Sequence, residues 1–129
     1  MKTLNEIKLA QELIRFRTTL TEDKGLIRFL SKKLSSIGFK CKIIKSKGTG
    51  PKPALNLYAR IGKSKPHLNY LGHTDVVANL NGWKIPPFKG LIKNGVLHGR
   101  GAQDMKGGVA CFISAMSKFV ANKKFKGSI

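Results

Sequence analysis

The sequence predicts an α/β fold in which helices flank a mixed sheet. Apolar residues recur at helical spacing in three segments, apolar and polar residues alternate in several stretches between them, and glycine-containing turns separate these elements. With 129 residues the chain is long enough for one ordinary domain with its own core. No apolar run approaches the roughly 20 residues that span a membrane.

The first two predicted helices lie at the N-terminus. Residues 4–16 carry apolar side chains at helical spacing. In the second helix, Thr21 is the expected N-cap, Glu22 and Asp23 suit the positive helix end, and Gly38 suits a left-handed stop. The expected buried stripe of this second helix comprises Leu26, Ile27, Leu30, Leu34 and Ile37.

Three strands and a hairpin are predicted next. Residues 39–43 and 55–60 alternate between apolar and polar positions, which is typical of half-buried strands. Residues 67–71 indicate a further strand that leads into a Gly-His-Thr-Asp motif. Asn94-Gly95, flanked by apolar residues, predicts a two-residue hairpin turn.

A third helix is predicted over residues 105–123, followed by a turn over 125–129 that leads into a strand. The apolar positions expected to face the core from this helix are Val109, Phe112, Ile113, Met116, Phe119 and Val120. The predicted elements correspond to the first part of an α/β domain, and the elements that would complete it are not among them.

The chain is strongly basic, with 25 Lys and Arg against 6 Asp and Glu and a net charge of +19. Such an excess allows a non-enzymatic, polyanion-binding domain as a second functional class. The excess is mostly lysine and is spread along the chain, and of its two densest stretches, 40–52 and 118–126, the first lacks interleaved aromatic residues that stack on bases. A solvated, lysine-rich surface is therefore the favoured interpretation.

The two cysteines, Cys41 and Cys111, form no Cys-x-x-Cys motif. We expect both to be small buried side chains in a reducing compartment. The N-terminal residues 1–13 are interrupted by charged residues, unlike a signal peptide. The expected location is the cytoplasm.

Two glycine-rich motifs, residues 72–77 and 99–108, contain Asp75 and Asp104, two of the six acidic residues. His73 and Asp75 are two positions apart, so in extended backbone their side chains point the same way. A carboxylate that accepts one ring N–H fixes the imidazole tautomer and leaves the other nitrogen available for a metal. By itself, a His-x-Asp pair is a weak signal.

Asp104 has two interpretations. It precedes the third predicted helix and is a reasonable N-cap. It also follows Gly99-Arg100-Gly101, whose glycines permit unusual backbone conformations, and a carboxylate can bridge two divalent ions. Because a carboxylate has two oxygens, the two roles need not exclude each other. His67 is expected to be structural, and Arg100 and Lys106 are weaker candidates for orienting a substrate carboxylate.

On these motifs the sequence resembles the metal-dependent aminoacylase and deacylase superfamily, and within it the succinyl-diaminopimelate desuccinylase family. The matching stretches are residues 56–60, 71–77, 83–88 and 95–108. The alanine at position 102 favours the desuccinylases, because acetylornithine deacetylases tend to carry threonine there. Acetylornithine deacetylase-like and other acyl-amino-acid deacylases or carboxypeptidases remain the alternative enzymes.

The resemblance implies a role for each candidate residue. His73 matches a ligand of one zinc ion, Asp104 matches the carboxylate that bridges two zinc ions per subunit, and Asp75 matches the catalytic residue that clamps the His73 imidazole. Cobalt is able to substitute for zinc in this family. The implied reaction is hydrolysis of N-succinyl-LL-2,6-diaminopimelate to succinate and LL-2,6-diaminopimelate, in lysine biosynthesis. The implied partners are this small molecule and a second subunit, with no nucleic acid or membrane.

The sequence contains no His, Asp or Glu after Asp104. The resemblance implies that a Glu pair, a further Glu ligand, a C-terminal His and a dimerisation lid lie beyond residue 129. We therefore expect residues 1–129 to form the N-terminal portion of a zinc-hydrolase catalytic domain that stops before the lid. Its site would be incomplete and the isolated chain inactive.

Overall fold

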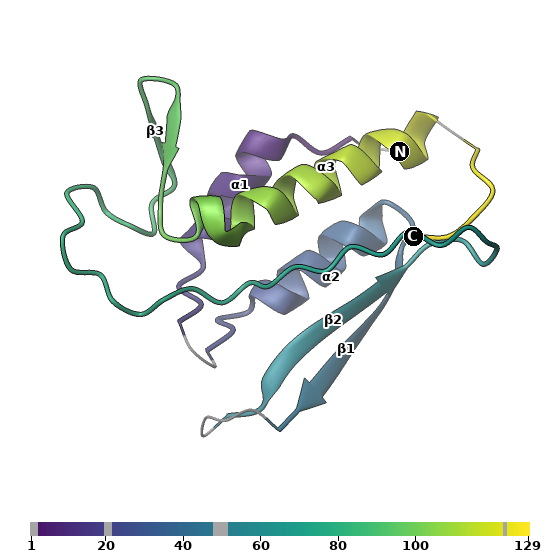
Figure 1. Ribbon diagram of the computed structural model, residues 1–129, viewed down its shortest axis with the longest axis horizontal. Helices are drawn as coiled ribbons and strands as arrows, with labels where there is room; N and C mark the ends of the chain where they lie inside the picture. The colour runs from purple at the N-terminus through teal and green to yellow at the C-terminus, as the bar shows by residue number, and fades with distance from the viewer. Residues whose placement is uncertain (1–2, 20–21, 48–51, 123) are drawn as a thin grey trace.

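Three helices pack beside a pair of antiparallel strands, as Figure 1 shows. The structure is a computed structural model that describes residues 3–19, 22–47, 52–122 and 124–129. Helix α1 (Glu6–Arg15) lies along α3 (Gly107–Asn122), and α2 (Leu26–Ser36) packs against strands β1 (Lys40–Ser46) and β2 (Ala54–Arg60). The buried core comprises Leu9, Ala10, Leu13, Leu26, Leu30, Leu34, Ile37, Phe39, Val109, Ala110 and Ile113.

The ends of α2 follow from the sequence around them. The Asp23 carboxylate accepts hydrogen bonds from the N–H groups of Gly25 (2.9 Å) and Ile27 (2.8 Å), which satisfies donors that the first turn leaves unpaired. At the other end Gly38 has φ 97° and donates its N–H to the Ser35 carbonyl, so the predicted left-handed stop is confirmed. The predicted cap, Thr21, lies outside the described residues.

Strands β1 and β2 pair antiparallel, with Cys41 opposite Ala59. Cys41, Leu57 and Ala59 pack against the core, while Ile44 and Tyr58 on the other face are 43% and 50% exposed. Both predicted strands are therefore confirmed, but β1 is more exposed than expected, since Ile43, on the same face as Cys41, is 37% exposed.

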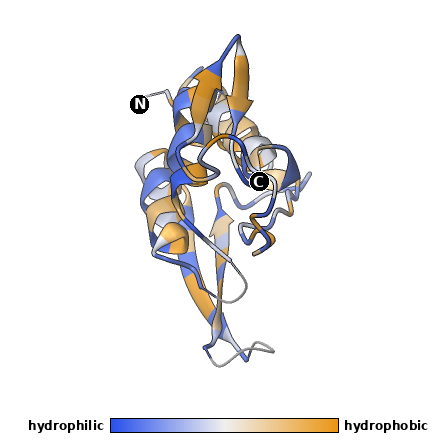
Figure 2. Cartoon of the chain, turned by 90° about the vertical axis from the view of Figure 1, so that its left-hand side faces the viewer, coloured by the Kyte–Doolittle hydropathy of each residue, from blue (hydrophilic) through white to orange (hydrophobic). Residues whose placement is uncertain are grey.

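Strands β3 (Leu91–Lys93) and β4 (Val96–His98) form the predicted hairpin. Its turn residues Asn94 and Gly95 both have positive φ, 52° and 76°, as a two-residue turn that matches the strand twist requires. The hairpin projects from the helices in Figure 1, and Figure 2 shows that much of it is hydrophobic.

Residues 67–71 do not form a regular strand, so this prediction is wrong. The segment is extended, but only His67 forms a β-bridge, with Ser128, and Leu71 is 86% exposed. A strand needs hydrogen-bonding partners along its length, and the described residues provide them only near the two ends of residues 67–76.

Helix α3 begins at Gly107, two residues later than predicted, after a kinked π-helical turn, η1 (Ala102–Lys106). Its buried face includes Ser114 and Ser117, whereas Phe119 of the expected stripe is 38% exposed. Small side chains let α1 lie close, and Ser117 Oγ accepts the Leu4 N–H at 2.8 Å. The predicted last residue, 123, lies outside the described residues.

The expectation that both cysteines are buried is wrong for Cys111, which is exposed; Cys41 is half-buried. No helix in the described ranges is both long and apolar enough to cross a membrane.

Candidate metal centre

The two glycine-rich motifs meet beside the N-terminal end of α3. Residues 74–76 are anchored to the chain that follows α1: the Val76 N–H donates to the Thr18 carbonyl at 2.8 Å, and the Thr18 hydroxyl donates to the Thr74 carbonyl. Thr18 is only 2% exposed, so both hydrogen bonds hold the motif to the body of the molecule. No motif or periodicity in the sequence indicates this role for Thr18.

Turn η1 places the second motif, residues 99–108, next to the first, residues 72–77. Gly101 has φ 82°, and its carbonyl accepts the Lys106 N–H at 2.8 Å, which closes the turn around Asp104. A Cβ at Gly101 would lie 2.6 Å from Cγ1 of Val76, so both the backbone conformation and the close approach require glycine. Asp104 and Met105, joined by a cis peptide bond, have non-helical backbone angles. The Asp104 side chain therefore leaves the helical path toward His73.

His73 lies between the two carboxylate residues. Its Nε2 is 2.9 Å from Oδ1 of Asp104, and its Nδ1 is 3.2 Å from the backbone carbonyl of Asp75 and 3.4 Å from Oδ1 of the same residue. The His73 N–H donates to Sδ of Met105 at 3.4 Å, a contact that the sequence analysis missed. The structure thus brings the three predicted site residues together, with Asp75 contacting the ring through main chain and side chain.

The three side chains are open to solvent, with exposed fractions of 47% for His73, 66% for Asp75 and 84% for Asp104. Partial burial lowers the pKa of the His73 imidazole. Hydrogen bonds to Asp104 and Asp75 and the charges of both carboxylates outweigh burial, so this pKa stands above its ordinary value. The site therefore attracts positive charge at an exposed surface.

The helix-cap interpretation of Asp104 has no support in this geometry. Helix α3 begins three residues later, and the hydrogen bond of the Asp104 side chain goes to His73 rather than to a backbone N–H of the helix. The position that precedes η1 is Gly101, which has no side chain to cap it.

Lys106, a weaker candidate for orienting a substrate, is fully buried and so is not placed for that role. Its ammonium donates to the Phe16 carbonyl at 2.7 Å, which ties η1 to the end of α1. Burial lowers the pKa of Lys106 to about 8, and the charge of Asp75 opposes this shift. Apolar periodicity could not reveal this residue, because lysines are rarely buried.

Arg100 also makes contacts that hold the surrounding chain in place. Its guanidinium lies 5.1 Å from the centre of the Trp83 ring and donates to the Asn79 carbonyl. These contacts hold residues 79–83 beside a hollow of about 470 Å³ that His73 and Asp104 also line. His67 is structural as expected, with Nδ1 2.8 Å from Oγ of Ser128.

The donors present suit a divalent cation in kind but not in number. Imidazole nitrogen and carboxylate oxygen are common zinc ligands, and protein zinc sites use three or four of them. The described residues contain no cluster of three or more potential ligands. The glutamates are engaged elsewhere, since Glu6, Glu12 and Glu22 each form an ion pair with a lysine. His73 and Asp104 therefore offer two donors, fewer than a protein zinc site uses.

The chain is similar to known sequences over its full length. Residues 70–129 match the sequence model of peptidase family M20/M25/M40. The chain is 49% identical over its full length to the succinyl-diaminopimelate desuccinylase of Pelagibacter ubique, covering 34% of that protein. It is 42% identical to the desuccinylase of Ehrlichia chaffeensis, with 93% of this chain and 32% of that protein aligned. The chain thus spans about a third of the length of these relatives.

Two solved structures share the fold. Human carnosine dipeptidase 1 superposes with a TM-score of 0.83 at 22% identity, over 96% of this chain and 30% of that one. An M20 family metallo-carboxypeptidase from Sulfolobus solfataricus superposes with a TM-score of 0.77 at 21% identity, over 97% of this chain and 29% of the other. The predicted α/β fold class is confirmed.

The described residues thus share an α/β fold with part of each of these two structures. Residues 70–129 match the model of peptidase family M20/M25/M40, and the chain as a whole is similar to succinyl-diaminopimelate desuccinylases. The resemblance drawn from the two motifs is confirmed.

Proposed function

We propose that these residues are the N-terminal portion of the catalytic domain of a cytoplasmic, homodimeric succinyl-diaminopimelate desuccinylase. The proposed reaction is hydrolysis of N-succinyl-LL-2,6-diaminopimelate to succinate and LL-2,6-diaminopimelate. The observation that carries the proposal is the convergence of His73, Asp75 and Asp104 in a chain that is 49% identical to a desuccinylase over its full length.

His73 Nε2 and the Asp104 carboxylate are the groups that would hold a divalent cation, zinc or cobalt. A bound cation of this kind supplies Lewis acidity toward an amide carbonyl and toward water. The two Asp104 oxygens, on a side chain that is 84% exposed, are available to two such ions, as the resemblance implies.

Asp75 acts through His73. Its carbonyl at 3.2 Å and carboxylate at 3.4 Å face Nδ1, so they hold the proton on that nitrogen and leave Nε2 as the donor toward a cation. Asp75 is therefore a positioning residue, and its removal should reduce turnover more than metal content.

Proton transfer needs a group that these residues do not place at the site, because all three glutamates of the sequence pair with lysines elsewhere. We infer that the general base and the remaining ligands belong to the other part of the complete enzyme. On this proposal the 129-residue chain alone releases no succinate.

A chimera tests the proposal. Residues 1–129 would be joined to the part of the Pelagibacter ubique desuccinylase that follows its aligned region, and succinate release and zinc content would be measured. We expect a zinc-dependent desuccinylase. A chimera that is folded and metallated but prefers N-acetylornithine would contradict the proposed substrate.

Three substitutions in this chimera separate the roles. Asp104→Ala should abolish activity and reduce bound metal, His73→Ala should weaken mainly one ion, and Asp75→Asn should keep most of the metal while losing turnover. Asp23→Asn, which only affects the start of α2, is the matched carboxylate control. A fully metallated, active Asp104→Asn enzyme would show that the assignment of Asp104 is wrong.

A further inference from the structure

A bend that follows β2 meets the C-terminal residues at the end of the molecule labelled C in Figure 1. Ile61 and Ile129 exchange both backbone hydrogen bonds, at 3.0 and 2.9 Å, and the Ser128 N–H donates to the Pro66 carbonyl at 2.9 Å. The two segments therefore form one hydrogen-bonded unit. The cationic residues that belong to this unit or lie opposite it in the sheet, which we call the basic patch, are Lys40, Arg60, Lys63, Lys65 and Lys126.

A buried serine fixes this unit. Ser128 is 2% exposed, and its hydroxyl donates to the Ser64 carbonyl at 2.9 Å. The same oxygen accepts a hydrogen bond from Nη2 of Arg60 at 3.2 Å and lies 2.8 Å from Nδ1 of His67. Because the hydroxyl has only one hydrogen and donates it to Ser64, Nδ1 of His67 carries the proton of the second contact. These bonds hold the start and the end of the bend in fixed relative positions.

The two segments also approach too closely to leave room for a side chain between them. Gly62 has φ 79°, and a Cβ on it would collide with the Gly127 carbonyl. The Gly127 N–H donates in turn to Oγ of Ser64 at 3.0 Å. The exposed lysines next to these anchored residues are Lys63, Lys65 and Lys126. A partner therefore meets charges whose backbone is already ordered, which reduces the entropy lost on binding.

No acidic residue of the chain neutralises the basic patch. The sequence has six acidic residues, and the structure describes all of them. The three glutamates form ion pairs with lysines outside the patch. Asp23 accepts hydrogen bonds at the start of α2, and Asp75 and Asp104 lie beside His73. The clustered positive charges of the patch therefore attract a negatively charged partner.

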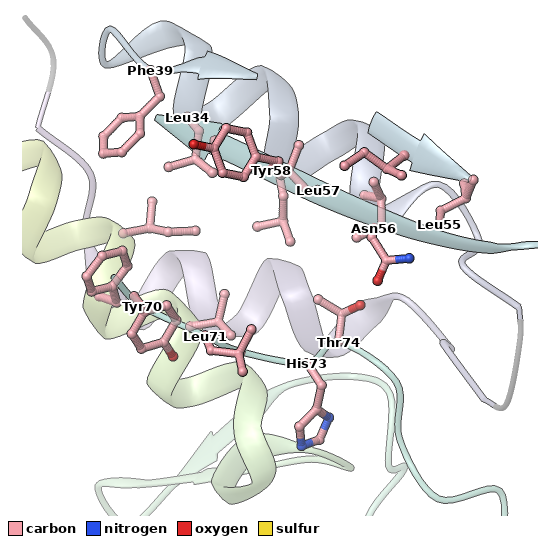
Figure 3. Close-up of a pocket in the computed structure, with 18 of the residues that line it drawn as sticks. Leu34, Phe39, Leu55, Asn56, Leu57, Tyr58, Tyr70, Leu71, His73 and Thr74 are labelled. Atoms are coloured by element: carbon pink, nitrogen blue, oxygen red, sulfur yellow. The ribbon is translucent and has the colours of Figure 1, made fainter. Parts of the chain in front are cut away.

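The basic patch lies apart from the metal centre. The extended chain that leaves the bend at His67 leads to the first motif, and Figure 3 shows Tyr70 and His73 farther along it. His73 follows His67 by six positions, which corresponds to about 20 Å at roughly 3.3 Å per residue of extended chain. The patch is therefore a docking surface rather than part of the candidate metal centre.

We propose that the basic patch docks a carboxylate-rich segment of a partner protein, a stretch dominated by Asp and Glu. A lysine ammonium is a compact, hydrated charge that pairs with carboxylates without a fixed geometry. Complementary charge of this kind steers encounter and sets the orientation of a partner more than it adds affinity. The proposal concerns a surface remote from His73, and it stands whether or not the complete protein is a desuccinylase.

The residues around the patch favour a protein over a nucleic acid. Arg60, the only arginine of the patch, is bonded to Ser128 through Nη2 and its Nε is buried, so no open guanidinium fork is available for a phosphate. The patch contains no aromatic side chain on which a base stacks. Phe125, beside Lys126, packs instead against Phe119, with 5.3 Å between the ring centres. A nucleic acid would therefore gain only the attraction of its phosphates.

Two triple substitutions with the same net charge test the proposal. Lys63→Gln, Lys65→Gln and Lys126→Gln remove three charges of the patch, whereas Lys8→Gln, Lys84→Gln and Lys93→Gln remove three exposed charges from other parts of the chain. Binding of a fluorescent oligoglutamate peptide to the 129-residue chain would be measured by anisotropy at low and at physiological salt. We expect the patch variant to bind about tenfold more weakly than the unsubstituted chain, and the control variant to bind within about twofold of it.

A third variant, with arginine at positions 63, 65 and 126, keeps the charges and should bind as the unsubstituted chain does. If the glutamine variant of the patch fails to fold, Lys63→Gln and Lys126→Gln replace it singly, each with an expected loss of about twofold. Equal losses in the patch and control variants would overturn the proposal, because overall charge would then suffice. Tighter binding of oligothymidylate or of phosphatidylserine vesicles than of the peptide, with the same dependence on the patch, would also overturn it. So would the absence of peptide binding at low salt.

Discussion

Nε2 of His73 lies 2.9 Å from Oδ1 of Asp104, although the two residues are 31 positions apart in the sequence. The turn η1 and the hydrogen bonds of Thr18 bring them together, since one presents Asp104 and the other anchors residues 74–76. The pair is therefore a product of tertiary structure rather than of either motif alone. Each of these contacts can be tested separately by substitution.

The first prediction concerns the charge of His73. Because the Asp104 carboxylate favours the protonated imidazole, Asp104→Asn should lower the pKa of His73. An NMR titration of the ring signals of the 129-residue chain measures this shift. Asp23→Asn removes an equal charge away from the ring and should leave the titration unchanged. A His73 titration that is the same in Asp104→Asn and in the unsubstituted chain would show that the pair does not form in solution.

The second prediction concerns the glycine that shapes the site. Gly101→Ala places a Cβ 2.6 Å from Val76, whereas Gly82→Ala, at almost the same φ (81° against 82°), meets no atom within 4 Å. Both alanines bear the cost of positive φ, so their difference isolates the steric clash. We expect Gly101→Ala to lower the free energy of unfolding by about 1–3 kcal/mol more than Gly82→Ala, measured by urea denaturation. Equal losses would mean that Val76 moves aside without cost.

The sequence predicted the local features of this fold better than the tertiary ones. Gly38 and the dipeptide Asn94-Gly95 adopt the expected conformations because their turns depend on a few adjacent residues. The strand over residues 67–71 failed because a strand depends on neighbours distant in sequence, and the described residues pair with it only at the ends of the segment. Alternation alone contains no information about those neighbours.

In the candidate site, too, the sequence predicted some features and not the tertiary contacts. Residue type made His73, Asp75 and Asp104 candidates, the resemblance implied their roles, and the structure brings all three together. Thr18 and Lys106, which hold the site in place, were missed or misassigned. Their contacts go to backbone carbonyls of Thr74 and Phe16, which a sequence motif does not reveal.

The third prediction concerns the pH dependence of stability. Burial lowers the pKa of Lys106 from 10.5 to about 8 in the folded chain, so the unfolded chain binds a proton that the folded chain lacks between these values. The destabilising contribution of Lys106 is complete below pH 8 and disappears as the pH rises toward 10.5, so stability should increase over this window. The full change is about 3 kcal/mol, from about 1.4 kcal/mol per pKa unit.

Other groups titrate over the same range, so the measurement is the difference between the unsubstituted chain and Lys106→Met, followed by urea denaturation from pH 7.5 to 10.5. Methionine keeps the aliphatic stem but cannot titrate, and it also loses the hydrogen bond to Phe16. We expect the pH-dependent rise to be absent in Lys106→Met. A parallel pH dependence in both proteins would show that Lys106 keeps an ordinary pKa in the folded chain.

The last prediction concerns metal binding by these residues alone. Structural zinc sites with four protein ligands bind with about 10–16 kcal/mol, and His73 and Asp104 supply only two donors. We therefore expect the 129-residue chain to bind zinc with a Kd of roughly 10⁻⁴ to 10⁻⁶ M, about half that free energy. Isothermal titration calorimetry measures it, with His73→Ala and Asp104→Ala each expected to weaken binding and Asp23→Asn to leave it unchanged. Binding should also weaken as the pH falls through the raised pKa of His73, because the imidazolium cannot coordinate a cation. Two tight, stoichiometric zinc ions on this chain would contradict the view that the metal centre needs ligands from elsewhere. Weak binding that neither His73→Ala nor Asp104→Ala changes would place the zinc at another site.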